Sequence, residues 1–214
     1  MRKLDRPSLP PLCLRQFQQN PKAVWGNLRG PDRAQIWQSL AQMQDHFCAY
    51  CQGAIKPHSQ NSFIEHFYQR SDYPHWTFDW NNLFGSCNTK ETCGNHKDNQ
   101  AKNISPTGIC KPDVHDPDIL LNFLASGEVQ PKPGLTAQNQ ARAENTIKAF
   151  NLQHSSLVNR RRTIASNEGQ LAEQLYEYLD EFPGEPELIQ QLKEHRNRIA
   201  KEEFSAVRHT IWNS

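Results

Sequence analysis

The sequence predicts an α+β protein in which a small cysteine-rich module is flanked on both sides by helical segments. Two cysteine pairs fall within residues 45–104, beside short apolar stretches with the alternation of strands. Apolar residues before and after this stretch recur at helical spacing. We therefore divide the chain into an N-terminal strap and helix at 1–44, the cysteine-rich module at 45–104, and a loop-rich connector with a helical C-terminal region at 105–214.

The N-terminal segment begins with a proline-rich strap, RPSLPPL, and continues into a predicted helix over about 32–44. Ile36, Leu40 and Met43 recur there at the spacing of one helix face. That face is expected to pack against the rest of the protein.

From Thr136 onward, apolar residues recur at helical spacing, which predicts a helical C-terminal region. The FPGEP motif at 182–186 predicts a break, and a last helix is expected to run from about Glu187 to Ile211. In the proline-containing connector before these helices, the stretch NFLASGEVQ predicts a short hairpin that turns at Gly127.

Overall composition excludes several classes of protein. The chain has 24 Lys and Arg residues against 23 Asp and Glu, so no bulk positive charge indicates a nucleic-acid partner, and such a contact would need a local patch. The mean hydropathy of −0.83 and the lack of a long apolar run predict no membrane span. The first residues, MRKLDRPSLPPLCLRQF, contain no apolar core of a secretory signal, so we expect a cytoplasmic protein.

The two cysteine pairs favour a metal site over other uses of cysteine. Cys48 and Cys51 form a C-x2-C pair, and Cys87 and Cys93 form a wider C-x5-C pair. Four thiolates are a common ligand set for structural zinc, whereas a redox pair would be expected beside a βαβ pattern that is not visible here. Buried thiols without a metal are the remaining alternative. Cys13 and Cys110 lie outside these pairs and are expected to be ordinary buried cysteines.

The residues between and after the cysteine pairs predict two strands and a short helix. FIEHF alternates like a strand and carries Glu65 and His66 at an end that is expected to be exposed. WNNLFGSC predicts the second strand, with Asn82 before it, and CGNHKDNQ predicts the start of a helix. This order resembles the HNH, or ββα-metal, endonuclease motif. The fold that the resemblance implies is a ββα-metal core clamped by a four-cysteine zinc knuckle.

A longer resemblance covers roughly residues 10–165. Together with CAYC, IEHF, DWNNLFGSC and CGNHKD, the downstream stretches DPDILLNF, GEVQPKPGL, RAENTIKAFNL and LVNRRR are similar to the HNH nucleases of the Septu anti-phage system (PtuB type) and their retron-associated relatives. The resemblance implies a metal-dependent nuclease that acts in antiviral defence. It also implies a partner ATPase of the ABC/SMC-like (PtuA) type, and a retron context would add a reverse transcriptase and its DNA–RNA product.

Hydrolysis of a phosphodiester needs an activated water and a cation, and the module offers residues for both. His66 is the candidate general base, and Glu65 is a candidate ligand of Mg²⁺ or Mn²⁺ through a hard carboxylate oxygen. Asn82 matches the middle position of the motif, where it would brace the loop beside His66. The third motif position is Asn95 or His96, and Asn95 is the favoured one and a second candidate ligand of the catalytic metal.

Arg70 and Lys97 are candidate phosphate contacts, with solvated surface cations as the alternative interpretation. The expected substrate is nucleic acid, with DNA favoured over RNA. The alternative function is a zinc-stabilised adaptor that has lost catalysis and binds nucleic acid or protein. The sequence does not choose between the Septu and retron contexts.

Overall fold

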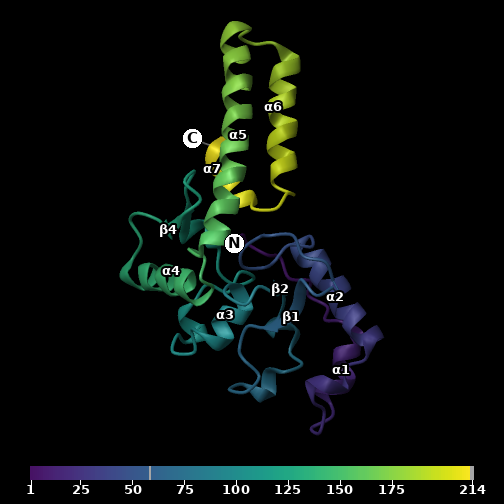
Figure 1. The fold of residues 1–214 in the computed structure, drawn as a ribbon. Helices are drawn as coiled ribbons and strands as arrows, with labels where there is room; N and C mark the ends of the chain where they lie inside the picture. Colours follow the sequence, from purple (N-terminus) through teal and green to yellow (C-terminus); the bar gives the residue numbers. More distant parts are fainter. Residues whose placement is uncertain (58, 213–214) are drawn as a thin grey trace.

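The computed structural model describes residues 1–57 and 59–212 and confirms a mixed α+β fold (Figure 1). Its helices are α1 (Leu12–Gln18), α2 (Gly30–Gln44), α3 (Cys93–Asn99), α4 (Ala137–Ala149), α5 (Ser155–Glu181), α6 (Pro186–Ile199) and α7 (Ser205–Trp212). Its strands are β1 (Ser62–His66), β2 (Leu83–Cys87), β3 (Leu121–Phe123) and β4 (Val129–Pro131). The strands form two separate two-stranded antiparallel sheets.

The central module consists of β1, β2 and α3 in chain order. The two strands pair so that Glu65 lies opposite Phe84 and His66 lies opposite Leu83. Helix α3 begins at Cys93, a few residues after β2, and lies beside that strand (Figure 1). The strands and the helix predicted within 62–99 are therefore present. This arrangement places the end of β1 opposite the start of β2, and the start of α3 near the end of β2.

The predicted hairpin around Gly127 is also present, as β3 and β4. Gly127 has a φ of +85°, which favours glycine, and a Cβ at this position would lie 2.1 Å from the carbonyl oxygen of Val158 in α5. The turn of the hairpin thus packs directly against the backbone of α5. The second sheet is held at the base of the long C-terminal helices.

The predicted last helix over about 187–211 is two helices. Helix α6 ends at Ile199 and α7 begins at Ser205, after a turn in which Phe204 has a φ of +54°. The Phe204 ring is buried, and its backbone N–H donates a hydrogen bond to the Gln52 carbonyl at 3.1 Å. These contacts with the loop that carries Cys51 interrupt the helix, although apolar residues continue at helical spacing in the sequence on both sides of the interruption.

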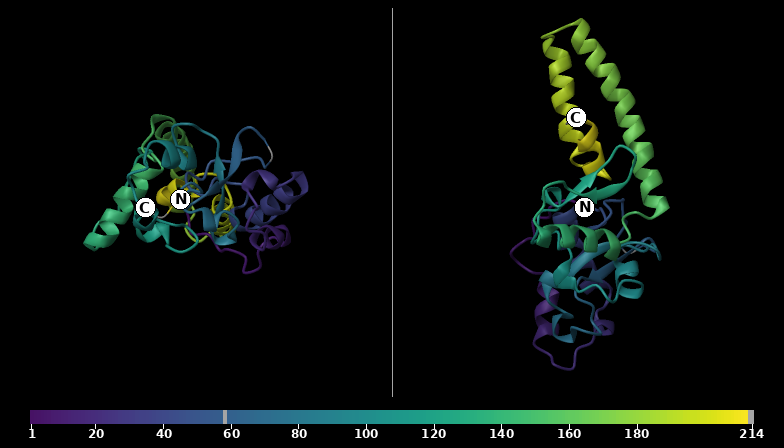
Figure 2. Two further views of the ribbon diagram at one scale, coloured as in Figure 1. Left: turned by 90° about the horizontal axis from the view of Figure 1, so that it is seen from below. Right: turned by 90° about the vertical axis from the view of Figure 1, so that its left-hand side faces the viewer.

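Helices α5 and α6 form a hairpin that projects away from the rest of the molecule (Figures 1 and 2). At its base, the buried Glu168 carboxylate accepts hydrogen bonds from His195 Nε2 at 2.8 Å and Trp212 Nε1 at 2.7 Å. Arg208 forms an ion pair with the same carboxylate. Because these partners come from α6 and α7, one side chain of α5 ties all three helices together.

One apolar core joins the central module to both flanking regions. It includes Leu4 and Leu14 near the N-terminus, Phe67 and Phe84 in the module, and Phe204 before α7. Within the described ranges, no helix has the combined length and apolar character required to cross a bilayer. The module thus shares its core with segments distant in sequence, and it does not depend on its own apolar residues alone.

Candidate metal centre and candidate active site

Four cysteines meet at the junction of the loop after α2, the end of β2 and the start of α3. The sulfur atoms of Cys48, Cys51, Cys87 and Cys93 all lie within 4.8 Å of one another, and this group could hold a metal ion such as zinc. Cys13 and Cys110 are buried elsewhere, as expected. The two pairs that the spacing singled out therefore belong to one cluster.

The geometry of this cluster suits a tetrahedral metal. Ligands at about 2.3 Å from a tetrahedral zinc lie about 3.8 Å from each other, and the Cys51 and Cys87 sulfur atoms are 3.9 Å apart. The Gly53 backbone N–H donates to Cys51 Sγ at 3.4 Å, a contact that helps to offset negative charge on sulfur. Hydrogen bonds from Cys48 and the other thiols lower the pKa of Cys87. The cluster can therefore supply a thiolate, which is the ligand form of cysteine.

Glu65 is buried between β1 and α3, not exposed at a strand end. Its carboxylate accepts a hydrogen bond from the Tyr50 hydroxyl, and its Oε1 lies 2.9 Å from Lys97 Nζ. The contact with Lys97 is a buried ion pair, and it gives Oε1 its charged partner. Burial raises the pKa of Glu65, although the nearby Lys97 ammonium opposes this.

His66 is also buried, and its ring is held in one orientation. Nε2 lies 3.0 Å from the carbonyl oxygen of Thr77, which can only accept, so Nε2 carries the proton in this contact. The neutral ring then has its lone pair on Nδ1. Trp25 packs edge-on against the imidazole, with 4.4 Å between ring centroids. Burial lowers the pKa of His66 to about 3 and keeps the ring neutral at physiological pH.

Asn82 braces the loop that follows His66. Its Oδ1 accepts a hydrogen bond from the Tyr68 backbone N–H at 2.7 Å, and its Nδ2 donates to the carbonyl oxygens of Tyr68 and Trp76. Trp76 immediately precedes Thr77, whose carbonyl orients the His66 ring. The side chain that the sequence assigns to a bracing role thus lies where it can hold both ends of this loop.

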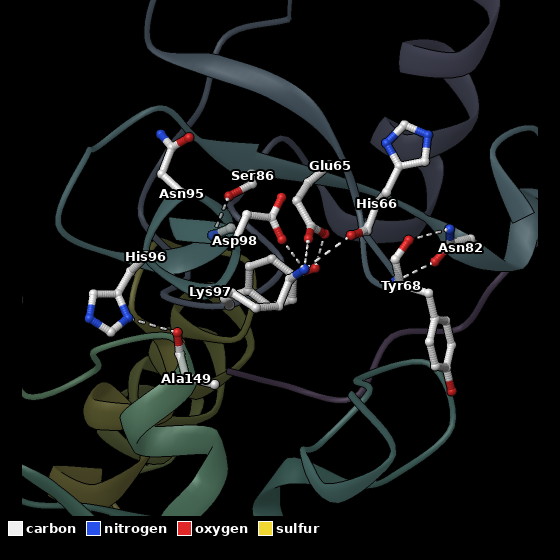
Figure 3. Close-up of polar contacts among 12 residues, drawn as sticks. Glu65, His66, Tyr68, Asn82, Ser86, Asn95, His96, Lys97, Asp98 and Ala149 are labelled. Atoms are coloured by element: carbon white, nitrogen blue, oxygen red, sulfur yellow. Dashed lines mark hydrogen bonds and ion pairs between the residues drawn. The ribbon is translucent and has the colours of Figure 1, made fainter. Parts of the chain in front are cut away.

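Neither candidate for the third motif position faces Glu65 (Figure 3). Asn95 Nδ2 donates to the Asn88 side chain at 3.1 Å and to the Thr89 carbonyl, so it ties down the loop between β2 and α3. The His96 ring lies 2.9 Å from the Ala149 carbonyl at the end of α4. Both residues join α3 to its neighbours and point away from the carboxylate.

Gly94, Lys97 and Asp98 occupy the side of α3 that faces Glu65. A Cβ at Gly94 would lie 2.5 Å from Glu65 Cγ, so only glycine allows this close approach. Lys97 is buried, and its ammonium lies 2.5 Å from Asp98 Oδ1 and donates to the His66 carbonyl at 3.1 Å. Sequence reasoning missed Gly94 and Asp98, although both are within one helical turn of predicted residues.

A pocket of about 230 Å³ opens beside this carboxylate. It is lined by Phe63, Ile64, Glu65, His66, Gln69, Arg70, Ser71 and Asp98. Arg70 is exposed, so its guanidinium is available for a ligand, whereas the Lys97 ammonium is engaged inside the protein. Figure 3 shows that the His66 imidazole turns away from the Glu65 carboxylate. The structure therefore groups Glu65, Lys97 and Asp98 closely and places the imidazole on the other side of the strand.

Comparisons with protein-family models and with curated proteins found no match for this chain. What the site can do therefore follows from its own side chains. The oxygen atoms beside Lys97 are of the kind that a hard divalent cation prefers. The lone pair on Nδ1 of the neutral His66 ring can accept a proton, as a weak base in this buried arrangement because the pKa is about 3.

The buried neutral His66 predicts a loss of stability in acid. The unfolded chain binds a proton on this residue below about pH 6.5, whereas the folded chain resists it down to about pH 3. Stability therefore falls as the pH decreases through this window, by about 2 kcal/mol at pH 5. Urea unfolding between pH 4 and pH 7 should show a smaller pH dependence for His66→Gln than for the wild type.

The exposed His75 provides the control for this measurement. His75→Gln is expected to keep the wild-type pH dependence. If His66→Gln and the wild type lose the same stability between pH 7 and pH 5, His66 is not held neutral by its surroundings.

Proposed function

We propose that this chain is a metal-dependent endonuclease of the HNH type that hydrolyses phosphodiester bonds in nucleic acid. The observation that carries the proposal is the fixed tautomer of His66, whose Nε2 is engaged by the Thr77 carbonyl while Nδ1 keeps its lone pair. A general base needs such a neutral ring with one free nitrogen. The order β1, β2, α3, with Glu65 and His66 at the end of β1, supports a ββα-metal core.

The residues near the pocket suit the remaining parts of this reaction. Glu65 and Asp98 offer carboxylate oxygens to Mg²⁺ or Mn²⁺, which would neutralise charge that develops on the phosphate. Arg70 lines the same pocket and can donate to a phosphate oxygen. Asn82 keeps the loop and the Thr77 carbonyl in place, so it acts as a positioning residue for His66.

We assign a structural role to the metal at the four cysteines, with zinc as the ion. All four ligands come from the protein, as in closed zinc sites that contribute to folding. The site joins the loop after α2 to β2 and α3. Strand β2 pairs with β1, which carries Glu65, and α3 carries Lys97, so the site would fix these two side chains relative to each other. The metal would hold this framework without contacting the substrate.

A catalytically inactive adaptor is the second candidate function. It is favoured by the burial of Glu65 against Lys97 and by the burial of the His66 ring against Trp25, because neither group is presented to a substrate in this arrangement. A zinc-stabilised binding module would keep the cysteines and lose cleavage. An activity assay separates the two functions.

The α5–α6 hairpin supports a partner protein. No Lys or Arg occurs between Arg162 and Lys193, whereas the outer part of the hairpin carries six acidic residues: Glu173, Glu177, Asp180, Glu181, Glu185 and Glu187. Tyr178 and Phe182 are 56% and 52% exposed there. This surface repels nucleic acid and suits a protein with basic residues around an apolar groove. We propose a separately encoded ABC/SMC-like ATPase as that partner, because the chain has no Walker-type phosphate loop.

The nuclease function predicts cleavage of plasmid DNA in Mg²⁺ or Mn²⁺ that EDTA abolishes. His66→Gln keeps an amide donor for the Thr77 carbonyl but provides no base, so its rate should fall by about 10²–10⁴-fold. His75→Gln is the matched control and should cleave like the wild type. Equal cleavage by His66→Gln would exclude His66 as the base, and no cleavage by the wild type with its ATPase present would favour the adaptor.

The zinc assignment predicts one tightly bound zinc per chain by mass spectrometry of the purified protein. Cys48→Ser removes one of four ligands and should cause loss of the metal and unfolding of the central module. Cys110→Ser changes a buried cysteine outside the cluster and should retain the zinc. A soluble, metal-free Cys48→Ser protein with full activity would contradict the assignment.

The partner proposal predicts that the hairpin mediates co-purification with an ATPase encoded beside this chain. Two sets of substitutions should each weaken the complex. Replacing Glu177, Asp180 and Glu181 by Lys reverses the negative charge of the hairpin tip. Replacing Tyr178 and Phe182 by Ala removes its exposed aromatic side chains. Val114→Ala changes an exposed apolar residue elsewhere and should have no effect. Unchanged co-purification after both sets of hairpin substitutions would place the contact outside the hairpin.

A further inference from the structure

Three oxygen atoms surround the Lys97 ammonium inside the protein (Figure 3). Nζ lies 2.9 Å from Glu65 Oε1, 2.5 Å from Asp98 Oδ1 and 3.1 Å from the His66 carbonyl oxygen. Two carboxylates and a backbone carbonyl are the donor set that Mg²⁺ and Mn²⁺ prefer. The ammonium therefore lies where these oxygens would meet around a metal ion.

The Glu65 carboxylate depends on a cation at this position. It is 1% exposed, and its Oε1 has the Lys97 ammonium, at 2.9 Å, as its charged partner. If the ammonium leaves, another cation must replace it, because an unpaired charge is costly in the protein interior. Gly94 leaves space beside Glu65 Cγ that any other side chain would fill.

The pocket described above lies beside this position, while the Glu65 and Lys97 side chains themselves are buried. The Asp98 side chain is 25% exposed and lines that pocket. A hydrated metal ion can therefore approach Asp98 from the pocket, and it can reach Glu65 once the Lys97 side chain moves. The ammonium and a metal ion cannot bind together, because both need the same three oxygens and both are positive.

We propose that Glu65, Asp98 and the His66 carbonyl form a divalent-cation site whose place is held by the Lys97 ammonium, so that Lys97 must leave before the metal binds. The function of this metal site rests on the proposed nuclease activity. The inference adds Asp98 as a metal ligand and Lys97 as a side chain that competes with the metal ion for the same oxygen atoms. The four-carbon stem of lysine allows the ammonium to swing out of the site. Once released, it becomes available to a substrate phosphate near Arg70. Metal and substrate then favour each other's binding.

The test measures Mn²⁺ binding by the EPR signal of free Mn²⁺, with the full chain loaded with zinc at its cysteines. Lys97→Met removes the competing charge at similar length, and Lys97→Gln is a second variant in case the first does not fold. Both should bind Mn²⁺ at least ten-fold more tightly than the wild type. Adding Asp98→Asn to either variant should reverse the gain. Lys102→Met, at an exposed lysine five residues later, should bind like the wild type.

A second measurement uses the wild-type chain alone. Lys97 should react slowly with an amine-acylating reagent when Mn²⁺ is absent and several-fold faster when it is bound, as read by mass spectrometry of the peptide that contains it. Equal Mn²⁺ affinity in the wild type and the Lys97 variants, or no Mn²⁺ binding by any of them, overturns the inference. If EDTA-sensitive cleavage persists in that case, the proposed nuclease stands with its metal elsewhere. Tighter binding by Lys97→Met, together with no cleavage by the wild type in the presence of its ATPase, supports the inference and argues against the nuclease.

Discussion

The position of Cys93 at the first turn of α3 is the constraint on which the central module depends. Its sulfur belongs to the four-cysteine cluster, and its backbone N–H donates to the Phe150 carbonyl at 2.9 Å. These contacts fix the rotation of α3 about its axis. Because a helix repeats every 3.6 residues, the faces of the next five residues are then determined.

That rotation explains both what the sequence could predict and what it could not. The strands, the short helix and the cysteine quartet were predictable, because alternation and ligand spacing are local signals. The direction of each α3 side chain was not, because it depends on where Cys93 meets the other cysteines. Asn95 therefore faces the loop between β2 and α3 and His96 faces the end of α4, while Gly94 and Asp98, which the motif did not single out, lie on the side of Glu65 and Lys97.

The break before α7 is a second feature that local sequence signals could not predict. Apolar residues continue at helical spacing from α6 into α7, so periodicity alone predicts one helix. The chain instead turns at Phe204, because its N–H and ring are captured by the loop that carries Gln52. The Gln52 side chain also donates to Ser205 Oγ at 3.0 Å. A contact between residues about 150 positions apart thus decides a local structure, and no short sequence window contains that information.

The two arms of the α5–α6 hairpin are tied together at their base by the cluster around Glu168, and the chain returns to the body of the protein at Phe204, which contacts the loop that carries Gln52. The 27 residues of α5 span roughly 40 Å, so the tip lies far from the chemistry, while both arms are anchored at the base. Insertions or deletions of whole helical turns in the two arms would change the reach of the tip by about 5.4 Å per turn. They would leave the anchored base unchanged. The hairpin could therefore change in length without disturbing the central module, and the distance of its tip from that module would change with it.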